Sequence, residues 1–327
     1  MSNKSVLVTG ANGFVGKALV TSLCQKGYTV RATVRSASAH AFMLDYQNQQ
    51  QLKNLSIYNE GELSEKTDWR EAIDHVDTII HCAARAHILR ETSTDPLETF
   101  RQINTRSTEN LALQASNQGV RRFIFLSSIG VLGHNSYDTP FTDASRPTPK
   151  VPYAQAKWEA EQSLHALSTT MDKIIIRPPI VYGPGVRGNF GALLNLIKKP
   201  IPLPFGAVQN RRQFIGIDNL VDFVLTCIAS KNNINETFLI ADKEIVSTTQ
   251  LLQNISHAMR KKTILLPVPH ALLNWILKAI GKSKMAGQLL GNLEIQSNKA
   301  KSILNWEPPY SMSEQLAKLF DFEKSKT

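Results

Sequence analysis

The sequence predicts an α/β protein with a doubly wound parallel sheet and a smaller C-terminal lobe. Short runs of β-branched and apolar residues, typical of buried strands, alternate with helical patterns up to about residue 182. A glycine-rich turn joins the first of these runs to the first helical pattern. Of the 327 residues, 42% are hydrophobic and 20% are charged, which provides enough apolar material for a full core. Strands that alternate with helices form a parallel sheet that is covered on both faces.

The expected elements follow this alternation along the chain. Strands are expected at Ser5–Val8, Tyr28–Arg35, Thr78–His81, Arg122–Leu126 and Lys173–Ile176. Helices are expected at Lys17–Lys26, Pro96–Gln118 and Tyr153–Thr169 and, beyond a stretch broken by prolines, at Thr248–Lys261, Ala271–Ile280 and Ser313–Phe322. We therefore expect a first domain of residues 1–182, to which 212–245 return, and a second lobe of residues 183–211 and 246–327.

Basic residues exceed acidic ones, and the net charge is +10. Six basic residues share a span that contains no acidic residue: Arg260, Lys261, Lys262, Lys278, Lys282 and Lys284. A solvated basic face explains this span, and attraction to a phosphorylated ligand or to an anionic membrane surface is the alternative. Aromatic residues make up only 7% and do not interleave with the basic ones, so nucleic acid is not an expected partner.

The three cysteines, Cys24, Cys82 and Cys227, form no CxxC pair and no cluster with histidine. We therefore expect neither disulfides nor a metal site, and we expect a cytoplasmic location. No apolar stretch approaches the roughly 20 residues of a membrane span, and the first residues do not resemble a signal peptide. The helix expected at Ala271–Ile280, with Trp275, is interpreted as a packed helix, with peripheral membrane association as the alternative.

The turn after the first strand carries Gly10, Gly13 and Gly16 in the spacing GxxGxxG. One glycine permits a tight turn, one lets the backbone approach a pyrophosphate, and one lets the helix lie close to the strand. The helix N-terminus then faces the phosphates. An ordinary tight turn is the alternative, but the strand, turn, helix and strand in succession favour a Rossmann dinucleotide site. The residues of this turn expected to bind the cofactor are Gly10, Asn12, Gly13, Phe14, Val15 and Gly16.

The end of the second expected strand indicates which dinucleotide binds. NAD sites usually place a carboxylate there, about 20 residues after the glycines, to accept hydrogen bonds from the ribose hydroxyls. This sequence has Arg35 instead, whose guanidinium would bind the 2′-phosphate of NADP. We therefore expect NADP as the cofactor, with NAD as the alternative if Arg35 is only exposed to solvent.

Tyr153 and Lys157 lie four residues apart, on one face of an expected helix. A phenol with a pKa of about 10 is a poor acid–base catalyst at neutral pH unless a neighbouring ammonium stabilises its phenolate. Ser128, 25 residues upstream, would bind the reacting oxygen of the substrate, and adjacent Ser127 is its alternative. A surface helix pair is the alternative for Tyr153 and Lys157 alone, but together with the glycine turn these residues predict hydride transfer at a carbinol or ketone.

The turn VTGANGFVG, the stretch YAQAK at Tyr153 and the upstream Ser128 resemble the extended short-chain dehydrogenase/reductase family, over nearly the whole chain. The resemblance implies a catalytic triad of Ser128, Tyr153 and Lys157. It implies cofactor contacts from Tyr153 and Lys157 and from Glu62, Leu63, Cys82, Ala83, Ala84, Asn104 and Pro179, for several of which ordinary strand-end packing is the alternative. The resemblance alone implies a homodimer through the helices expected at 96–118 and 153–169.

Residues 177–185, RPPIVYGPG, are similar to a segment of the nucleotide-sugar enzymes of this family. The resemblance implies that Asn189 and Arg212 contact a nucleotide diphosphate, for which a planar guanidinium is well suited. A surface salt bridge is the alternative for Arg212. Phe205 would border the base, with core packing as its alternative. The substrate contacts expected besides these are Ser127, Ser128 and Tyr153.

Leu132 and Ile180 replace a tyrosine and an asparagine that are frequent in the sugar 4-epimerases of the family. Together with Arg35 they favour a reductase acting at C4 of a UDP-hexose. The expected substrate is a UDP-4-keto-6-deoxy-N-acetylhexosamine of the UDP-N-acetylquinovosamine type, used in polysaccharide synthesis. The first alternative is a UDP-glucose or UDP-N-acetylglucosamine 4-epimerase. A small-alcohol reductase and a redox-sensing binding protein are further alternatives, and the complete triad argues against the last.

Overall fold

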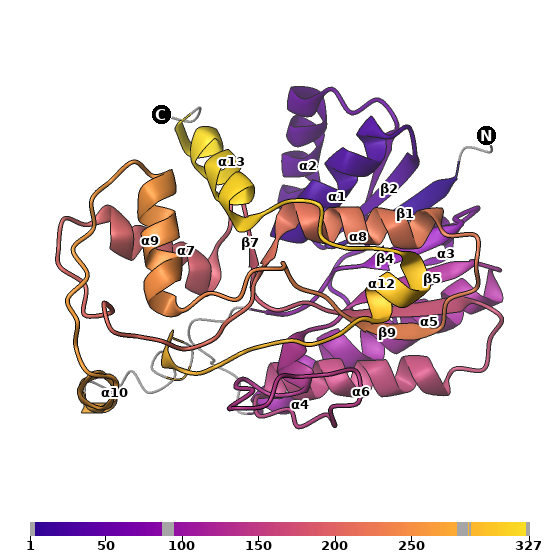
Figure 1. Cartoon of the computed structure of the whole chain (residues 1–327). Coiled ribbons are helices and arrows are strands. Elements are labelled where there is room, and N and C mark those ends of the chain that lie inside the picture. The colour runs from indigo at the N-terminus through magenta and orange to yellow at the C-terminus, as the bar shows by residue number, and fades with distance from the viewer. Residues whose placement is uncertain (1–3, 87–94, 280–286, 288, 325–327) are drawn as a thin grey trace. The chain divides into compact units, whose positions relative to one another are not determined.

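The computed structural model describes residues 4–86, 95–279, 287 and 289–324, in two compact units (Figure 1). Unit 1 comprises Met1–Val131, Pro147–Arg177 and Phe223–Phe238, and unit 2 comprises Leu132–Arg146, Pro178–Asp222 and Leu239–Thr327.

A seven-stranded sheet in the order β3-β2-β1-β4-β5-β6-β9 forms the centre of unit 1 (Figure 1). The strands are β1 Ser5–Thr9, β2 Thr29–Val34, β3 Leu55–Asn59, β4 Thr78–His81, β5 Arg122–Leu126, β6 Asp172–Arg177 and β9 Glu236–Leu239. Strand β1 pairs in parallel with β2 and β4, β2 with β3, β4 with β5, and β5 with β6. The strand order therefore reverses at β1, which creates a crevice at the carboxyl ends of β1 and β4 where doubly wound folds bind ligands. The predicted fold class, a Rossmann α/β sheet, is confirmed.

Helices cover both faces of this sheet, with α1 and α2 on one side and α5 and α6 on the other (Figure 1). The helical segments of unit 1 are α1 Phe14–Gln25, α2 Ala37–Gln50, α3 Arg70–Ile73, α4 Pro96–Phe100, the π-helical turn η1 Arg101–Arg106, α5 Ser107–Asn117, the short η2 Ile129–Val131, α6 Pro152–Ala166 and most of α8 Ile217–Ala229. Apolar side chains of β4 and β5, such as Ile79 and Phe123, pack against Leu111 of α5 and Leu164 of α6. This core holds the strand ends and α6 in fixed positions for the site described below.

The helix predicted as one piece at Pro96–Gln118 contains the π-helical turn η1 between α4 and α5. Ser107 and Thr108 donate their hydroxyls to the carbonyls of Ile103 and Asn104, four residues earlier. Thr105 donates its hydroxyl to the carbonyl of Ala156 in α6. Such side-chain bonds to the backbone compete with the regular helical ladder, and π-helical turns are frequent at functional sites.

The prediction lacked α2 and β3, because neither element has a strong apolar pattern. In α2 only Ala39 and Met43 are buried, and in the edge strand β3 only Leu55 is. The predicted strand 173–176 is one residue longer at each end in the structure, and the predicted helix 153–169 ends at Ala166.

Unit 2 contains α7 Gly188–Lys198, α9 Thr248–Ala258, α10 His270–Ala279, α12 Lys299–Leu304, α13 Met312–Lys324 and a parallel pair of short strands, β7 Val181–Tyr182 and β8 Ile215–Gly216. Its core brings together Leu193 of α7, Leu252 of α9 and Leu316 of α13. A capping box of Ser247 and Gln250 starts α9 at the predicted residue. The helix stops before the predicted Lys261.

The segment that returns to unit 1, Phe223–Phe238, is shorter than the predicted 212–245. Residues 212–222 belong to unit 2 because the backbone of Arg212 pairs with Val246 and Asp222 accepts a hydrogen bond from Trp306. The loop 132–146 also belongs to unit 2, where Phe141 donates its backbone N–H to Glu294.

Ile280, Lys282 and Lys284, singled out in the sequence, lie outside the described residues. None of the helices in the described ranges is long and apolar enough to cross a bilayer.

Candidate active site

The glycine turn packs so closely that side chains are excluded from it. Gly10 has a φ of +65°, and a Cβ there would lie 2.8 Å from the Cα of Ala83. A Cβ on Gly16 would lie 2.2 Å from the carbonyl oxygen of Gly10. The turn closes with a hydrogen bond of 2.9 Å from the N–H of Gly13 to the same carbonyl. Gly10 therefore lets the end of β1 lie against the loop that follows β4.

Helix α1 presents its N-terminus at this turn. Gly13 precedes the helix and offers no side-chain cap, and the first turn carries no acidic side chain. Phe14 and Val15 are partly exposed there, and Asn12 is exposed. A helix N-terminus of this kind attracts anionic groups. The turn therefore fits the pyrophosphate of a dinucleotide, both in shape and in electrostatics.

A buried histidine, His81 at the end of β4, connects the two loops. Thr9 accepts hydrogen bonds from the backbone N–H groups of Cys82 and Ala83, at 3.2 and 3.1 Å, so its own proton goes to Nδ1 of His81 at 2.7 Å. Nε2 of His81 then carries the ring proton and donates it to Thr108 at 2.9 Å. Burial, together with the smaller effect of the charge of Lys157, lowers the pKa of His81 to about 3. The ring is thus a neutral, fully hydrogen-bonded link.

Asn104 holds the loop that follows β4. Its side chain accepts the N–H of Arg85 at 2.7 Å and donates to the carbonyl of Arg85 at 3.1 Å. This backbone clamp starts from the π-helical turn η1, which places Asn104 next to the loop of Cys82, Ala83 and Ala84. The three small residues and Asn104 therefore lie close together, and their predicted contacts with a cofactor stay a prediction.

At the end of β2, Arg35 is exposed, and Ser36 follows as the N-cap of α2. Glu62 is also exposed, while Leu63 packs against the core. Among the described residues no carboxylate forms an ion pair with Arg35. The strand end therefore has the guanidinium expected from the sequence, together with a serine hydroxyl and a helix N-terminus.

The two adjacent serines after β5 have different surroundings. Ser127 is buried and donates its hydroxyl to the carboxylate of Glu161, which also forms an ion pair with Arg177. Ser128 is only partly buried, and its oxygen accepts a hydrogen bond of 3.1 Å from the N–H of Gly130. The hydroxyl of Ser127 is therefore occupied inside the protein, whereas that of Ser128 keeps its proton for another acceptor.

Helix α6 positions Tyr153 and Lys157 one turn apart. The ring of Tyr153 meets that of Phe100 edge-on, with 6.1 Å between ring centroids. The ammonium of Lys157 donates to the carbonyl of Leu126 at 2.8 Å and lies 4.3 Å from the ring centroid of Phe125. The lysine therefore reaches from α6 to the end of β5, just before the two serines.

Burial changes the acidity of both groups. It raises the pKa of Tyr153 to about 12 and lowers the pKa of Lys157 to about 8. Burial is the cause of the raised pKa of Tyr153, so the stabilisation of its phenolate expected from Lys157 does not appear in this pKa. An additional positive charge near Tyr153 would be needed for its ionisation near neutral pH.

In unit 2, Arg212 is 4% exposed and donates to the carbonyl of Gly291 at 2.8 Å. Among the described residues no carboxylate pairs with it, and burial lowers its pKa to about 10. Its neighbour Arg211 is exposed and forms two hydrogen bonds of 2.6 and 2.7 Å with Glu294. Arg211 therefore forms a surface salt bridge, while the buried guanidinium of Arg212 has N–H donors that could bind an anion.

The other predicted substrate residues lie in unit 2 without comparable contacts. Asn189 is exposed in the first turn of α7. Phe205 is 4% exposed within the core, so core packing describes its ring. Pro179, predicted as a cofactor contact, is buried in unit 2, and Ile180, the residue that departs from the epimerase pattern, packs against the core there.

The sequence analysis missed Thr9, His81 and Glu161 as parts of the site. Glu161 follows Lys157 by four residues and so lies on the face of α6 that carries Tyr153 and Lys157, a spacing that could have indicated it. No local pattern points to the hydrogen bonds of His81, because its partners are 72 and 27 residues away.

Comparisons with known proteins agree with this geometry. Residues 6–241 match the NAD dependent epimerase/dehydratase family. A UDP-glucose 4-epimerase of Vibrio cholerae is 40% identical over 316 residues, which are 95% of this chain and 93% of that protein.

Two solved structures share the fold. One is a UDP-N-acetylglucosamine 4-epimerase from Methanobrevibacter ruminantium M1 in complex with UDP-N-acetylmuramic acid. Its TM-score is 0.79 at 20% identity, and the match covers 100% of both chains. A UDP-glucuronic acid 4-epimerase from Bacillus cereus in complex with NAD has a TM-score of 0.75 at 23% identity, covering 98% of this chain and 99% of that one. The resemblance to the extended short-chain dehydrogenase/reductases is confirmed, and the chain belongs to the NAD-dependent epimerase/dehydratase family.

Proposed function

We propose that the chain is a nucleotide-sugar 4-epimerase, which inverts the configuration at C4 of a UDP-hexose by oxidising and reducing that carbon. The observation that carries the proposal is the arrangement around the end of β5. Among the described residues, the hydroxyl of Ser128 accepts from Gly130 but donates its proton to no acceptor, and Lys157 reaches to the same strand end from the helix that carries Tyr153. The Vibrio cholerae relative, named a UDP-glucose 4-epimerase, supports the reaction class and favours the alternative over the reductase expected from the sequence.

Ser128 would donate its hydroxyl to the oxygen on C4, and Tyr153 would take the proton of that hydroxyl and later return it to the same oxygen. A nicotinamide cofactor held at the glycine turn of Gly10, Gly13 and Gly16 would supply the hydride chemistry at C4 in both directions. Lys157 is positively charged below pH of about 8, which favours the phenolate of Tyr153. Ser127 and Glu161 would hold the strand end in place without contacting the sugar.

The cofactor and the diphosphate would be held by separate groups. Gly10, Gly13 and Gly16 would accommodate the pyrophosphate of the cofactor, and Asn104 and His81 would keep the loop of Cys82 in position. In unit 2, Arg212 would bind the diphosphate of the sugar nucleotide, because a buried guanidinium without a carboxylate has donors to offer an anion.

A second candidate is the 4-keto-sugar reductase expected from the sequence, and Arg35 favours it. A guanidinium beside Ser36, without a carboxylate, suits the 2′-phosphate of NADP, and NADPH is the usual donor in reductive synthesis. The cofactor preference, the homodimer and the cytoplasmic location stay predictions.

Incubation of the purified protein with UDP-glucose and with UDP-N-acetylglucosamine separates the two candidates. An epimerase forms the C4 epimer without net consumption of added cofactor. A reductase leaves these sugars unchanged and oxidises one NADPH for each UDP-4-keto-6-deoxy sugar it converts. Tyr153→Phe should abolish either reaction while retaining nucleotide affinity, and turnover by this variant would contradict the assignment of Tyr153.

A further inference from the structure

The chain between α9 and α10 forms an exposed basic and apolar surface on unit 2, here called the 260–275 face. It consists of seven side chains: Arg260, Lys261, Lys262, Ile264, Leu266, Leu272 and Trp275. All seven side chains are exposed, with exposed fractions of 63% for Ile264 and 67% for Trp275. Several large apolar side chains exposed within one short segment indicate a binding site more often than a single exposed one does.

The outward direction of these side chains is fixed by their neighbours. Leu203 and Leu265 pair as a parallel bridge, with hydrogen bonds of 2.9 Å from Leu203 to Ile264 and 2.8 Å from Leu266 to Leu203. Leu203 is buried and Leu265 packs against the core, so Ile264 and Leu266 on either side of Leu265 face solvent.

Helix α10 has the same division into two sides. Leu273 is 1% exposed and belongs to the core of unit 2, which agrees with the packed helix expected from the sequence. Leu272 and Trp275, three residues apart, are exposed. The core contact therefore holds the helix so that its other side presents an indole and a leucine to the surroundings.

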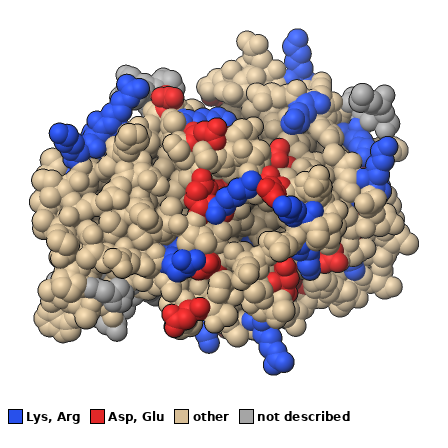
Figure 2. Space-filling view, in the orientation of Figure 1, with Lys and Arg blue, Asp and Glu red and all other residues tan. Residues whose placement is uncertain are grey.

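The charge around this face has one sign. Residues 245–293 contain six basic residues and no aspartate or glutamate. Among the described residues, no carboxylate pairs with Arg260, Lys261 or Lys262, and Lys199 at the end of α7 is exposed as well. In Figure 2, Lys and Arg side chains lie at the upper left with Asp or Glu atoms beside them, and the surface below is mostly uncharged. The segment therefore offers positive charge and exposed apolar side chains, and it contains no carboxylate of its own.

We infer that the 260–275 face binds the surface of an anionic lipid bilayer. Cations beside a surface of anionic headgroups are attracted to it, and Trp, Leu and Ile side chains insert at the boundary of headgroups and acyl chains. A second copy of the chain fits less well, because a twofold contact would place the same unpaired cations against each other. The inference does not depend on the sugar or on the reaction assigned above.

Co-sedimentation of the full-length protein with vesicles tests the inference. Binding is expected to vesicles of phosphatidylcholine that contain phosphatidylglycerol and not to phosphatidylcholine alone. It should be lost in about 1 M salt, where the screening length falls to about 3 Å. Each basic residue near the bilayer contributes roughly fivefold to the affinity, so Lys261→Glu with Lys262→Glu should weaken binding at least about 25-fold. Ile264→Ser with Trp275→Ser should weaken it as well, because insertion is lost.

The matched control is Lys53→Glu with Lys231→Glu, which changes the net charge equally at exposed positions of unit 1. This control should retain most of the binding, and circular dichroism checks that all variants are folded. Equal loss in the control would show that binding follows net charge alone and would overturn the inference. Absence of binding to anionic vesicles would overturn it too. The same holds if the protein does not bind vesicles but forms a dimer that dissociates in the Trp275→Ser variant.

Discussion

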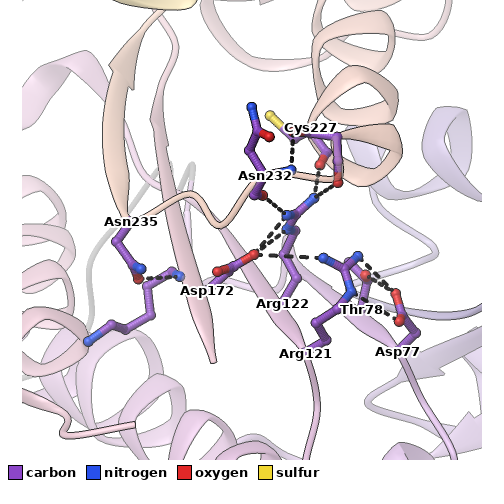
Figure 3. Close-up of polar contacts among 10 residues, drawn as sticks. Asp77, Thr78, Arg121, Arg122, Asp172, Cys227, Asn232 and Asn235 are labelled. Atoms are coloured by element: carbon purple, nitrogen blue, oxygen red, sulfur yellow. Dashed lines mark hydrogen bonds and ion pairs between the residues drawn. The ribbon is translucent and has the colours of Figure 1, made fainter. Parts of the chain in front are cut away.

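Two buried arginines, Arg122 in unit 1 and Arg212 in unit 2, differ in how many hydrogen-bond partners surround their guanidinium groups. Arg122 is 0% exposed and donates to Asp172 at 2.7 Å and to the carbonyls of Cys227, Ser230 and Asn232 (Figure 3). Arg212 is 4% exposed and donates to one carbonyl, that of Gly291.

The difference separates a structural arginine from one suited to a ligand. A guanidinium has five N–H donors, and Arg122 uses its donors on the end of α8, the chain after it and the carboxylate in β6. Its charge is compensated inside unit 1. Arg212 is buried, and among the described residues no carboxylate compensates its charge, which an anionic ligand would do. A buried cation whose hydrogen-bond donors and charge are all matched inside the protein thus indicates a role in folding. A buried cation that is only partly matched indicates a role in binding.

The largest effect is expected for Arg122→Met. Removal of the guanidinium leaves Asp172 buried without its main partner, which typically costs about 3–5 kcal/mol. Urea unfolding measures the loss. Arg121→Met is the control, because Arg121 is 35% exposed, pairs with Asp77 and approaches Asp172 only at 3.7 Å, and pairs of this kind contribute about 1 kcal/mol or less. Equal losses in the two variants would contradict the structural role of Arg122.

Arg212→Met should reduce the affinity for UDP rather than the stability. The free energy of unfolding should stay the same or rise, because an uncompensated buried charge disappears, while the affinity for UDP falls about 100-fold. Calorimetry with UDP measures the affinity. Arg211→Met, at a site already paired with Glu294, should change it less than about twofold. Loss of stability without loss of affinity in Arg212→Met would remove the distinction between the two arginines.

His81 is a buried neutral group that can be compared with the two arginines. Both of its ring nitrogens form hydrogen bonds inside the protein. Its pKa is about 3 in the folded chain and about 6.5 when unfolded, so the unfolded state binds more protons between these values. Stability should therefore fall as the pH drops below 6.5, by up to about 1.4 kcal/mol per pH unit from this group. His81→Asn should be less stable at pH 7 but lose less on acidification.

Urea unfolding at pH 7 and pH 5 compares the slopes. The exposed His75, changed to Gln, should leave the slope as in the unaltered chain. An unchanged slope in His81→Asn would mean that the ring is not held neutral by the fold.

The smallest effect is expected at the exposed Arg35. Arg35→Ser should weaken NADP binding about tenfold, because a charge-assisted bond to the 2′-phosphate is lost, and should leave NAD binding nearly unchanged. Fluorescence titration with both reduced dinucleotides measures the ratio, and Lys53→Ser in the same unit is the control. Equal weakening of both dinucleotides, or of neither, would remove the argument for NADP.

The parts of the fold and site that follow from short-range pattern were predictable. Strands β4 and β5 are short buried runs that appear as continuous apolar stretches, and the glycines mark the turn between β1 and α1. Helix α2 and strand β3 bury too few side chains to show a pattern. The distinction between Ser127 and Ser128 depends on Glu161, 34 residues from Ser127, and that between Arg211 and Arg212 depends on residues about 80 positions away. Such distinctions are set by tertiary contacts, which composition and spacing do not contain.

Transfer of an isotope label tests the proposed 4-epimerase most directly. The protein is incubated with UDP-glucose that carries deuterium at C4, and the sugar products are analysed by NMR and mass spectrometry. Epimerisation at C4 predicts UDP-galactose that retains the deuterium at C4 and a Tyr153→Phe variant that forms none. Absence of the C4 epimer, or an epimer that has lost its deuterium, would contradict the proposal.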